Sequence, residues 1–390
     1  MSTQPGEFRR LAIVGASYAG VGLASELRSL GFSGEIHLFG EEGCLPYHRT
    51  HLSKECLAGA PKPPALLRPE TFFAERQINF HAGAEIVRID RVGRTVHCAN
   101  GLEYGYDRLV LATGASARAL PGSASEHALT LRTAMDASIL AHRLLEARRV
   151  AIIGGGLIGL EVAAAARARG LDVTVLEAAP RLMARSTYPA ISERALQFHR
   201  TSGCDVRLNA QVAEVTREGV FLADGTLVIA DLVLASLGSI PRVELAQNAG
   251  LACTNGIVTN GTGQTEDPLV YAIGDCALWE HAGECQRHES VAASQAQASI
   301  VAAELLGLSP RPVSPLRLWS TQGALRIQMT GPVIPTAQIS TEEVDGGGLL
   351  VQAFENGRLV AVQAVNASRS FNAALQQLWQ RQEEYESIKA

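Results

Sequence analysis

The sequence predicts an α/β protein that contains the same folding unit twice, followed by an α+β segment near its C-terminal end. Two phrases carry this prediction, RLAIVGASYAG at residues 10–20 and RVAIIGGGLIG at residues 149–159. Each is a short apolar run, then a turn of small residues, then a helix-forming stretch, and each has an acidic residue downstream. This is the layout of a strand, a tight turn and a helix that opens onto a phosphate. The repeat therefore predicts two Rossmann-like dinucleotide-binding domains.

The composition is that of a globular protein with several domains. The 390 residues favour two or three domains, and 47% are apolar against 19% charged. The net charge of −5 and the lack of a basic stripe argue against a nucleic-acid partner. The seven cysteines are scattered without metal-ligand spacing, which predicts no bound metal and reduced thiols in the cytoplasm. Beyond the first glycine turn no charge-free apolar run of membrane-spanning length occurs, so we expect no membrane partner.

Each copy of the repeat predicts a complete βαβ segment. In the first copy the strand, helix and second strand are expected at residues 11–14, 19–30 and 35–39. The second copy repeats this order at residues 150–153, 157–169 and 172–177. A βαβ segment of about 30 residues is the usual building block of such folds. Two further strands echo each other, DRLVLATG at 107–114 and ADLVLASLG at 230–238, and both end in a turn of small residues.

The last third of the chain returns to the first domain and then forms a domain of its own. An apolar strand at 268–277 ends in Gly-Asp, and a long helix is expected at 288–307, but this block has no glycine turn. A proline-rich link at 308–315 precedes a tail of strands and a final helix. We therefore expect a discontinuous first dinucleotide-binding domain at 1–117 with 240–314, an inserted second dinucleotide-binding domain at 118–239, and a C-terminal α+β domain at 315–390.

The second copy has a glycine at all three positions that the turn requires. Gly154 permits the tight turn, Gly156 lets the backbone approach a pyrophosphate, and Gly159 lets helix and strand pack closely. The phosphate then lies at the helix N-terminus, together with Leu157 and Ile158. This pattern predicts a nicotinamide dinucleotide site.

Glu177 ends the second strand of this copy, where a carboxylate accepts the ribose hydroxyls. Because it repels a 2′-phosphate, it favours NADH over NADPH, although Arg181 and Arg185 follow closely and weaken that preference. The predicted NAD site also includes Glu161, Gly238 and Glu289.

The first copy fills the same positions with Gly15, Ser17 and Gly20, and Glu41 stands where the ribose carboxylate belongs. Ser17 departs from the pattern, because its side chain crowds a pyrophosphate unless its hydroxyl bonds a phosphate oxygen. Two dinucleotide sites in one chain predict two dinucleotides in contact, FAD and NAD(H), between which a hydride passes without a side-chain acid or base. Gly274-Asp275 supports the flavin, since a carboxylate at a strand end can bind a ribityl hydroxyl. Small residues of the ATG segment at 112–114, including Thr113 and Gly114, lie near the same pyrophosphate.

With these motifs in place, the chain resembles the FAD-dependent ferredoxin reductases that serve aromatic-ring dioxygenases and bacterial P450 systems. The resemblance covers almost the whole chain and rests on PYHRTHLSKECL (46–57), TLRT (130–133), GGGLIGLEVAA (154–164), YAIGDCA (271–277) and WSTQGALRIQMTG (319–331). The last segment is specific, because the broader disulfide-reductase superfamily lacks it.

The resemblance implies roles for the residues that match it. Arg49 and Lys54 would contact FAD, with Lys54 near the reactive flavin N5 and paired with Glu161, and these two would be the catalytic residues. A lysine there makes chemical sense because it stabilises the negative charge of reduced flavin. The implied FAD shell further includes Val87, Thr113, Arg132, Ile158, Asp275, Val291 and Trp319.

The chain departs from the family pattern at three positions, two of them directly after Arg49. Thr50 and His51 replace two prolines after Arg49, and Val291 stands where an aromatic residue often lies against the flavin. These departures leave the flavin-contacting loop and the flavin stacking open.

The expected activity is electron transfer from NADH through FAD to a small [2Fe–2S] ferredoxin, which feeds a Rieske aromatic-ring dioxygenase or a related oxygenase in aromatic hydrocarbon catabolism. A rubredoxin reductase or a P450-ferredoxin reductase is an alternative, and the chain is expected to be a monomer or a homodimer. A second alternative is a thiol-dependent NADH oxidase, peroxidase or CoA-disulfide reductase that uses Cys44. In that class the cysteine stands three residues before the proline of a Pro-Tyr pair, whereas Cys44 stands two before Pro46. A third is a non-enzymatic flavoprotein like apoptosis-inducing factor, which no added segment favours.

Overall fold

The chain divides into two compact units in the structure, a computed structural model that describes residues 8–121, 126–281, 284–310 and 315–389. Unit 1 comprises residues 1–48, 65–116 and 240–313, and unit 2 comprises residues 49–64, 117–239 and 314–390. The predicted division differs from these units in two places. Residues 49–64 belong to unit 2, and the C-terminal segment shares that unit with the central segment. Within the predicted proline-rich link, residues 311–314 lie outside the described part of the chain.

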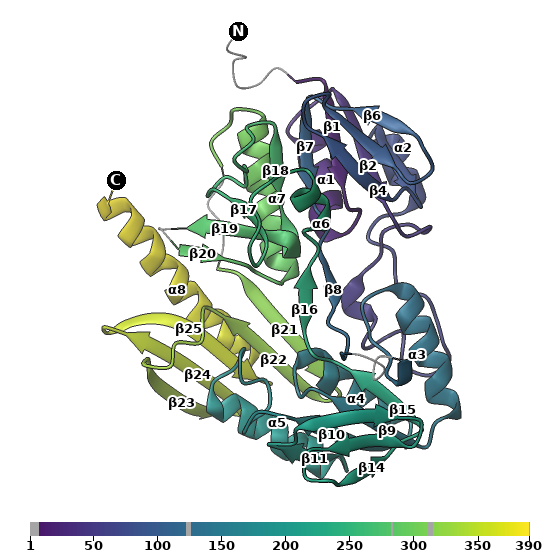
Figure 1. The fold of residues 1–390 in the computed structure, drawn as a ribbon. Coiled ribbons are helices and arrows are strands. Elements are labelled where there is room, and N and C mark those ends of the chain that lie inside the picture. Colours follow the sequence, from purple (N-terminus) through teal and green to yellow (C-terminus); the bar gives the residue numbers. More distant parts are fainter. Residues whose placement is uncertain (1–7, 122–125, 282–283, 311–314, 390) are drawn as a thin grey trace. The chain divides into compact units, whose positions relative to one another are not determined.

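Unit 1 is built on a parallel sheet whose central strand is the first predicted strand. The strand order is β18-β7-β1-β2-β3, formed by Val270–Ala272, Arg108–Leu111, Arg10–Val14, Glu35–Gly40 and Ile78–Ala82. Helices α1 (Tyr18–Ser29) and α7 (Val291–Leu305) pack against each other (Figure 1). Parallel strands end at the same edge of a sheet, so the segments that follow β18, β7, β1 and β2 come together there.

Shorter elements complete unit 1. One antiparallel sheet consists of β4 (Ile86–Asp90), β5 (Thr95–Cys98) and β6 (Glu103–Gly105), and another three-stranded sheet consists of β17 (Ile257–Thr259), β19 (Ala277–His281) and β20 (Glu284–Gln286). The helices are α2 (Glu70–Glu75), α6 (Glu244–Asn248) and the 3-10 turn η3 (Gly274–Cys276). Strands β8 (Ala115–Ala117) and β16 (Ser239–Pro241) pair at the two points where the chain passes from one unit to the other.

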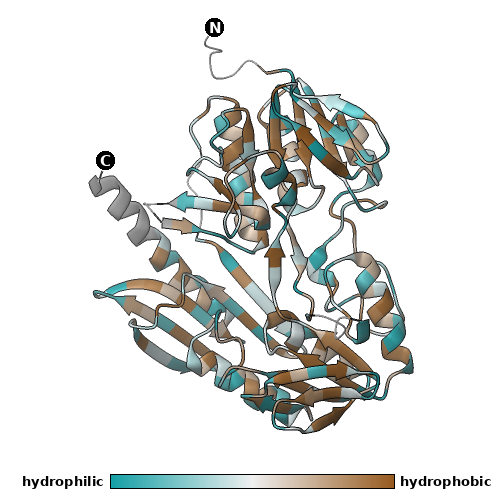
Figure 2. Ribbon diagram, viewed as in Figure 1, coloured by the Kyte–Doolittle hydropathy of each residue, from teal (hydrophilic) through white to brown (hydrophobic). Residues whose placement is uncertain are grey.

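Unit 2 repeats the central part of this architecture. Its parallel sheet has the order β11-β10-β9-β15, formed by Asp205–Leu208, Asp172–Glu177, Arg149–Ile153 and Leu232–Ala235. The helices are α3 (Ala134–Glu146), α4 (Leu157–Ala168), α5 (Pro189–Thr201) and the 3-10 turn η1 (Arg49–His51). A three-stranded sheet of β12 (Val212–Thr216), β13 (Gly219–Leu222) and β14 (Leu227–Ile229) joins it. Figure 2 shows the strands of both parallel sheets in the hydrophobic colour, as expected for strands buried on both faces.

The C-terminal segment forms an antiparallel sheet with a final helix. The order is β21-β22-β25-β24-β23, formed by Arg317–Gln322, Leu325–Thr330, Arg358–Val365, Gly348–Glu355 and Gln338–Val344. Helix α8 (Ser368–Lys389) packs Phe371 against this sheet, and β21 contacts α4. The predicted fold class is thus confirmed: two Rossmann-like segments and a C-terminal α+β segment.

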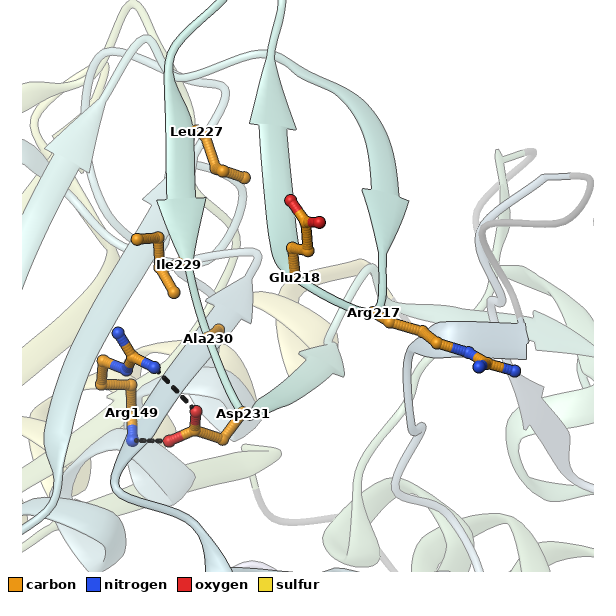
Figure 3. Close-up of a pocket in the computed structure, with 7 residues that line it drawn as sticks. All are labelled: Arg149, Arg217, Glu218, Leu227, Ile229, Ala230 and Asp231. Carbon is orange, nitrogen blue, oxygen red and sulfur yellow. Dashed lines mark hydrogen bonds and ion pairs between the residues drawn. The ribbon is translucent and has the colours of Figure 1, made fainter.

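The two Rossmann-like segments share a brace that the repeat did not reveal in the sequence. In unit 1 the backbone amides of Arg9 and Arg10 donate to one oxygen of Asp107 at 2.9 and 2.8 Å, and the Arg10 guanidinium donates to the other. In unit 2 the amides of Arg148 and Arg149 donate to Asp231 in the same way, as Figure 3 shows for Arg149. The brace ties the start of the first strand of each segment to the start of a neighbouring strand.

The surface pocket of Figure 3 lies at the contact between Arg149 and Asp231. It is lined by Arg149, Arg217, Glu218, Leu227, Ile229, Ala230 and Asp231. Arg149 begins β9 and Asp231 directly precedes β15, so the pocket lies at the amino edge of the parallel sheet. Ligands of open α/β sheets bind outside the carboxyl edge, so this pocket is not the dinucleotide site.

The Asp107 brace makes the stability of the protein depend on pH. Burial opposes ionisation, but the amides of Arg9 and Arg10 and the Arg10 guanidinium outweigh it and lower the pKa of Asp107. Because the pKa of Asp107 is lower in the folded state, its carboxylate stabilises the fold at pH values above the pKa of an aspartate in the unfolded chain, which is about 4. We expect Asp107→Asn to lower Tm at pH 7 by about 2–4 °C, the shift for about 1 kcal/mol.

The difference between the wild type and Asp107→Asn should shrink as the pH falls below about 4, because the wild-type carboxylate then becomes protonated. Differential scanning fluorimetry across pH 3–7 measures it, with the exposed Asp172→Asn as the matched control. A Tm difference that stays constant down to pH 3 would contradict the role of the charge.

Candidate functional site

The first glycine turn follows β1 in unit 1 and leaves no room for side chains at two positions. Gly15 has φ +116°, and a Cβ there would lie 2.0 Å from the carbonyl oxygen of Ala112. A Cβ on Gly20 would lie 2.0 Å from the carbonyl oxygen of Gly15. Ser17 is the N-cap of α1 without a side-chain capping bond, and the first turn of α1 has no acidic residue. This helix end suits an anionic phosphate, so the turn fits a dinucleotide.

The second turn, in unit 2, follows the same plan with all three glycines. Gly154 has φ +106°, and a Cβ there would lie 2.3 Å from the carbonyl oxygen of Ser236. A Cβ on Gly159 would lie 2.3 Å from the carbonyl oxygen of Gly154. Gly156, the N-cap of α4, has no atom within 4 Å of its missing Cβ, so the space in front of the helix is open. Leu157 and Ile158 form the first turn of α4. The turn fits a pyrophosphate placed on the helix end.

Glu177 ends β10 and is fixed beside this second turn. Its two carboxylate oxygens accept from the amides of Gly155 and Ala179, both at 2.7 Å. A carboxylate has about four lone-pair positions, so both oxygens retain capacity for ribose hydroxyls.

The two arginines after Glu177 differ in their surroundings. Arg181 donates to the carbonyl groups of Thr187 and Ala184 within its own loop. The exposed Arg185 has Nη2 3.0 Å from the position that a Cβ on Gly238 would take. Arg185 is therefore the cation that lies at the turn after β15, next to the predicted NAD residues.

The predicted FAD residues of unit 1 gather at the carboxyl edge of its sheet. Gly274 and Asp275 follow β18, and Thr113 and Gly114 follow β7. The amide of Gly274 donates to the buried Gln297, and a Cβ on Gly274 would lie 3.1 Å from Cβ of Ala19 in α1. Glu41 directly follows β2 and forms a 2.7 Å ion pair with Arg242. Val291 begins α7, whose N-cap is Ser290.

Unit 2 contains a buried carboxylate with four donors. Glu161, in the second turn of α4, is 3% exposed. One of its oxygens accepts from Lys54 Nζ at 2.6 Å and from Ser53 Oγ at 2.5 Å. The other accepts from Ser320 Oγ at 2.7 Å and from the amide of Thr321 at 3.3 Å. The predicted pairing of Lys54 with Glu161 is thus present, and the carboxylate is fully satisfied, as a buried charge must be.

A buried polar chain extends from this pair, and none of its residues was predicted as a site residue from the sequence. Gln322 donates to Ser320 Oγ at 3.2 Å, and its other amide atom lies 2.9 Å from Nε2 of His199. Burial lowers the pKa of His199, although the bond to Gln322 opposes the shift, so its ring is neutral at pH 7. The chain joins α5, β21 and α4 around Glu161. The sequence signal was the spacing of Ser320 and Gln322 two residues apart, which a β-strand directs to one face.

The remaining predicted residues lie apart from these clusters within each unit. Arg49 begins η1 in unit 2 and donates to the carbonyl oxygen of Arg132 at 2.7 Å. Val87 lies on β4 in unit 1 and Trp319 on β21 in unit 2, and their side chains are 48% and 44% exposed. Glu289 belongs to unit 1, where it pairs with Arg287, whereas the other predicted NAD residues belong to unit 2.

Five of the seven cysteines are poor candidates for redox chemistry. Burial raises the pKa of the thiols of Cys56, Cys98, Cys253 and Cys276, and that of Cys204 to about 11. A thiol with a raised pKa is rarely a thiolate and so reacts slowly. The other two, Cys44 in the loop after β2 and Cys285 in β20, are exposed.

Two features that would change the functional class are missing from the described part of the chain. It contains no cluster of three or more His, Cys, Asp or Glu side chains that could hold a metal ion. Nor does any helix in those ranges have both the length and the apolar character needed to cross a bilayer.

Comparison with known proteins agrees with this geometry. Residues 9–298 match the model of the pyridine nucleotide-disulphide oxidoreductase family, and residues 317–389 match the reductase C-terminal model. A rubredoxin-NAD(+) reductase from Pseudomonas putida is 39% identical over 371 residues, which cover 91% of this chain and 95% of the relative. The ferredoxin–NAD(+) reductase component of a biphenyl dioxygenase system from Paraburkholderia xenovorans is 37% identical over 379 residues, which cover 93% of this chain and 91% of the relative.

A solved structure shows the same likeness in three dimensions. The covalent complex of putidaredoxin reductase with putidaredoxin contains a chain with a TM-score of 0.90 and 37% identity, covering 95% of this chain and 93% of that one. The match includes both the dinucleotide-binding segments and the C-terminal segment. The chain therefore belongs to the pyridine nucleotide-disulphide oxidoreductase family, as one of its FAD- and NAD(H)-dependent reductases with a reductase C-terminal domain.

Proposed function

We propose that this protein is an NADH:ferredoxin oxidoreductase that passes electrons from NADH through FAD to a small [2Fe–2S] ferredoxin of an oxygenase system. The observation that carries the proposal is the presence of two dinucleotide-binding turns in one chain, after β1 in unit 1 and after β9 in unit 2. FAD accepts a hydride from a nicotinamide and releases the electrons one at a time, which a one-electron carrier requires.

The residues of the two turns would hold the two dinucleotides. The helix ends at Ser17 and Gly156 would face the phosphates, and Glu177 would accept the ribose hydroxyls of NADH. Asp275, at the carboxyl edge of the unit 1 sheet, would bind a ribityl hydroxyl. The tight turns at Gly15 and Gly154, the space that the glycines leave for a dinucleotide, and the family membership support these roles.

Lys54 would supply a fixed charge that acts on the chemistry. Its ammonium group is held by Glu161 and by the carbonyl oxygen of Thr50, at 2.6 and 3.1 Å, and its side chain is 20% exposed. A preorganised cation stabilises negative charge as it develops during reduction. Glu161 in turn holds the Lys54 side chain in place within a largely buried site.

The names of the relatives support an iron–sulfur protein as the partner. One is a rubredoxin reductase and another a ferredoxin reductase of a dioxygenase system, at nearly equal identity, 39% and 37%. The putidaredoxin complex shows that a protein of this fold docks a ferredoxin. We favour the ferredoxin of a Rieske dioxygenase for this chain, with a rubredoxin or P450 ferredoxin as the alternative, and place the reaction in the cytoplasm, where NADH is available.

The thiol-dependent alternative is tested by Cys44→Ser. We expect this variant to retain nearly all NADH-dependent reduction of a [2Fe–2S] ferredoxin, because electrons leave the flavin without a protein thiol. Steady-state reduction of the ferredoxin, with ferricyanide as a surrogate acceptor, measures it, and Cys285→Ser, another exposed cysteine, is the matched control. If Cys44→Ser abolishes turnover and Cys285→Ser does not, the oxidase or disulfide-reductase function replaces the one proposed here.

A further inference from the structure

Arg242 lies beside the first glycine turn, although no motif in the sequence pointed to it. Its backbone is fixed to the segment that follows β7. The amide of Arg242 donates to the carbonyl oxygen of Gly114 at 3.0 Å, and its own carbonyl oxygen accepts from Thr113 Oγ1 at 2.6 Å. The start of the Arg242 side chain is therefore held at the carboxyl end of β7.

The other end of the side chain reaches a different strand. Nη1 of Arg242 lies 2.7 Å from Oε2 of Glu41, which directly follows β2. In the sheet order β7-β1-β2, strand β1 stands between the two strands that the ion pair connects. Adjacent strands are about 4.8 Å apart, so Arg242 and Glu41 together span about 10 Å across the end of β1.

The segment that they span is the glycine turn. Gly15 follows β1 and touches both neighbours: its amide donates to the carbonyl oxygen of Phe39 in β2 at 2.8 Å, and its missing Cβ would lie 3.1 Å from the amide of Thr113. The guanidinium group is thus positioned at the turn that leads to the N-terminus of α1. That is where the geometry of the turn favours a pyrophosphate.

We propose that Arg242 is a ligand of the FAD pyrophosphate, and that it exchanges Glu41 for the phosphate oxygens when FAD binds. The inference rests on the proposed function, because it takes FAD as the dinucleotide of unit 1. Released from Arg242, Glu41 accepts the ribose hydroxyls. The chain thereby supplies a cation at the turn in which Ser17 replaces the second glycine.

Charge and exposure favour this exchange. The Arg242 and Glu41 side chains are 39% and 43% exposed, and ion pairs with this exposure are weak. A pyrophosphate carries more negative charge than a carboxylate and presents oxygens that match the planar guanidinium in a bidentate contact. Since the Arg242 backbone is already anchored at Thr113 and Gly114, only the side chain has to reorient.

The test is FAD affinity of the full chain, measured by the quenching of flavin fluorescence when the flavin-free protein is titrated with FAD. We expect Arg242→Gln to raise the Kd for FAD about 10- to 100-fold, the loss typical of hydrogen bonds to a charged group, and to reduce the increase of Kd with salt. Arg242→Lys should retain part of the affinity as a point charge. Arg10→Gln, at the opposite edge of the same sheet, is the matched control and should leave the Kd unchanged.

A double-mutant cycle separates direct contact from an effect through Glu41. If Arg242 binds the pyrophosphate, Arg242→Gln weakens FAD binding in the Glu41→Gln background as well. An unchanged Kd on adding Arg242→Gln to Glu41→Gln would mean that Arg242 only positions Glu41, and would overturn the inference. So would an Arg242→Gln variant that binds FAD as tightly as the wild type. A wild-type chain that binds no FAD would instead overturn the proposed function itself.

Discussion

Replacing Lys54 by alanine should slow reduction of the protein-bound flavin by NADH by about 100-fold, the usual cost of removing one preorganised charge at a developing anion. The structure supports a fixed charge, because Lys54 Nζ lies 2.6 Å from the buried Glu161 carboxylate. Anaerobic stopped-flow measurement of the visible flavin absorbance gives the rate directly.

Loss of Lys54 also leaves Glu161 without its cation, so folding has to be checked separately. Flavin content and Tm of the variant should be compared with those of Lys62→Ala, an exposed lysine in the same segment, which we expect to be neutral. The variant Lys54→Ala, Glu161→Gln removes both charges and should regain stability without regaining the rate. A Lys54→Ala protein with full flavin content and an unchanged rate would refute the role of Lys54.

NADH should be strongly preferred over NADPH, and Glu177→Ala should narrow the difference. The carboxylate ends β10 and is held by the amides of Gly155 and Ala179. It would meet a hydroxyl in one cofactor and a phosphate in the other. Two like charges at about 4 Å in an intermediate dielectric repel by about 4 kcal/mol, which bounds the preference at roughly 1000-fold. The ratio of kcat/KM for the two cofactors measures it.

Two variants make this test specific to charge at the ribose. Glu177→Gln keeps a hydrogen-bond acceptor but removes the charge, so it should narrow the difference mainly by improving NADPH. Asp172→Asn, at the other end of the same strand, should leave the ratio unchanged. Equal kcat/KM for NADH and NADPH in the wild type would rule out the proposed role of Glu177.

Apolar runs and glycine spacing predicted those elements of the fold that depend on residues close together in the chain. The apolar run and acidic end of residues 172–177 match β10 residue for residue, and the glycine turns lie where their spacing placed them. Within the strand predicted at 268–277, β18 covers only Val270–Ala272, and Ala277 already begins β19. Strand β18 ends early because Gly274 adopts φ +77° and begins a 3-10 turn.

Long-range contacts account for what the sequence did not reveal. Residues 49–64 were expected with the first domain by continuity, yet Ser53 and Lys54 bond Glu161, and Leu57 joins the hydrophobic core of unit 2. The contacts of Arg242 with Glu41 and of Ser320 with Glu161 join residues far apart in the chain. Spacing and periodicity carry no information about such pairs, because these arise only when the sheets have formed.

Electron transfer from NADH through FAD to a ferredoxin without a protein thiol can be observed in a single-turnover experiment. The holoprotein is mixed anaerobically with one equivalent of NADH and then with an oxidised [2Fe–2S] ferredoxin, while the flavin and ferredoxin absorbances are followed together. We expect rapid bleaching of the flavin, then its full recovery as two ferredoxins are reduced per NADH, in the wild type and in Cys44→Ser alike. A different result would be a bleached flavin that neither ferredoxin nor rubredoxin reoxidises, and that a disulfide or peroxide reoxidises only when Cys44 is present. This result would contradict electron transfer without a protein thiol.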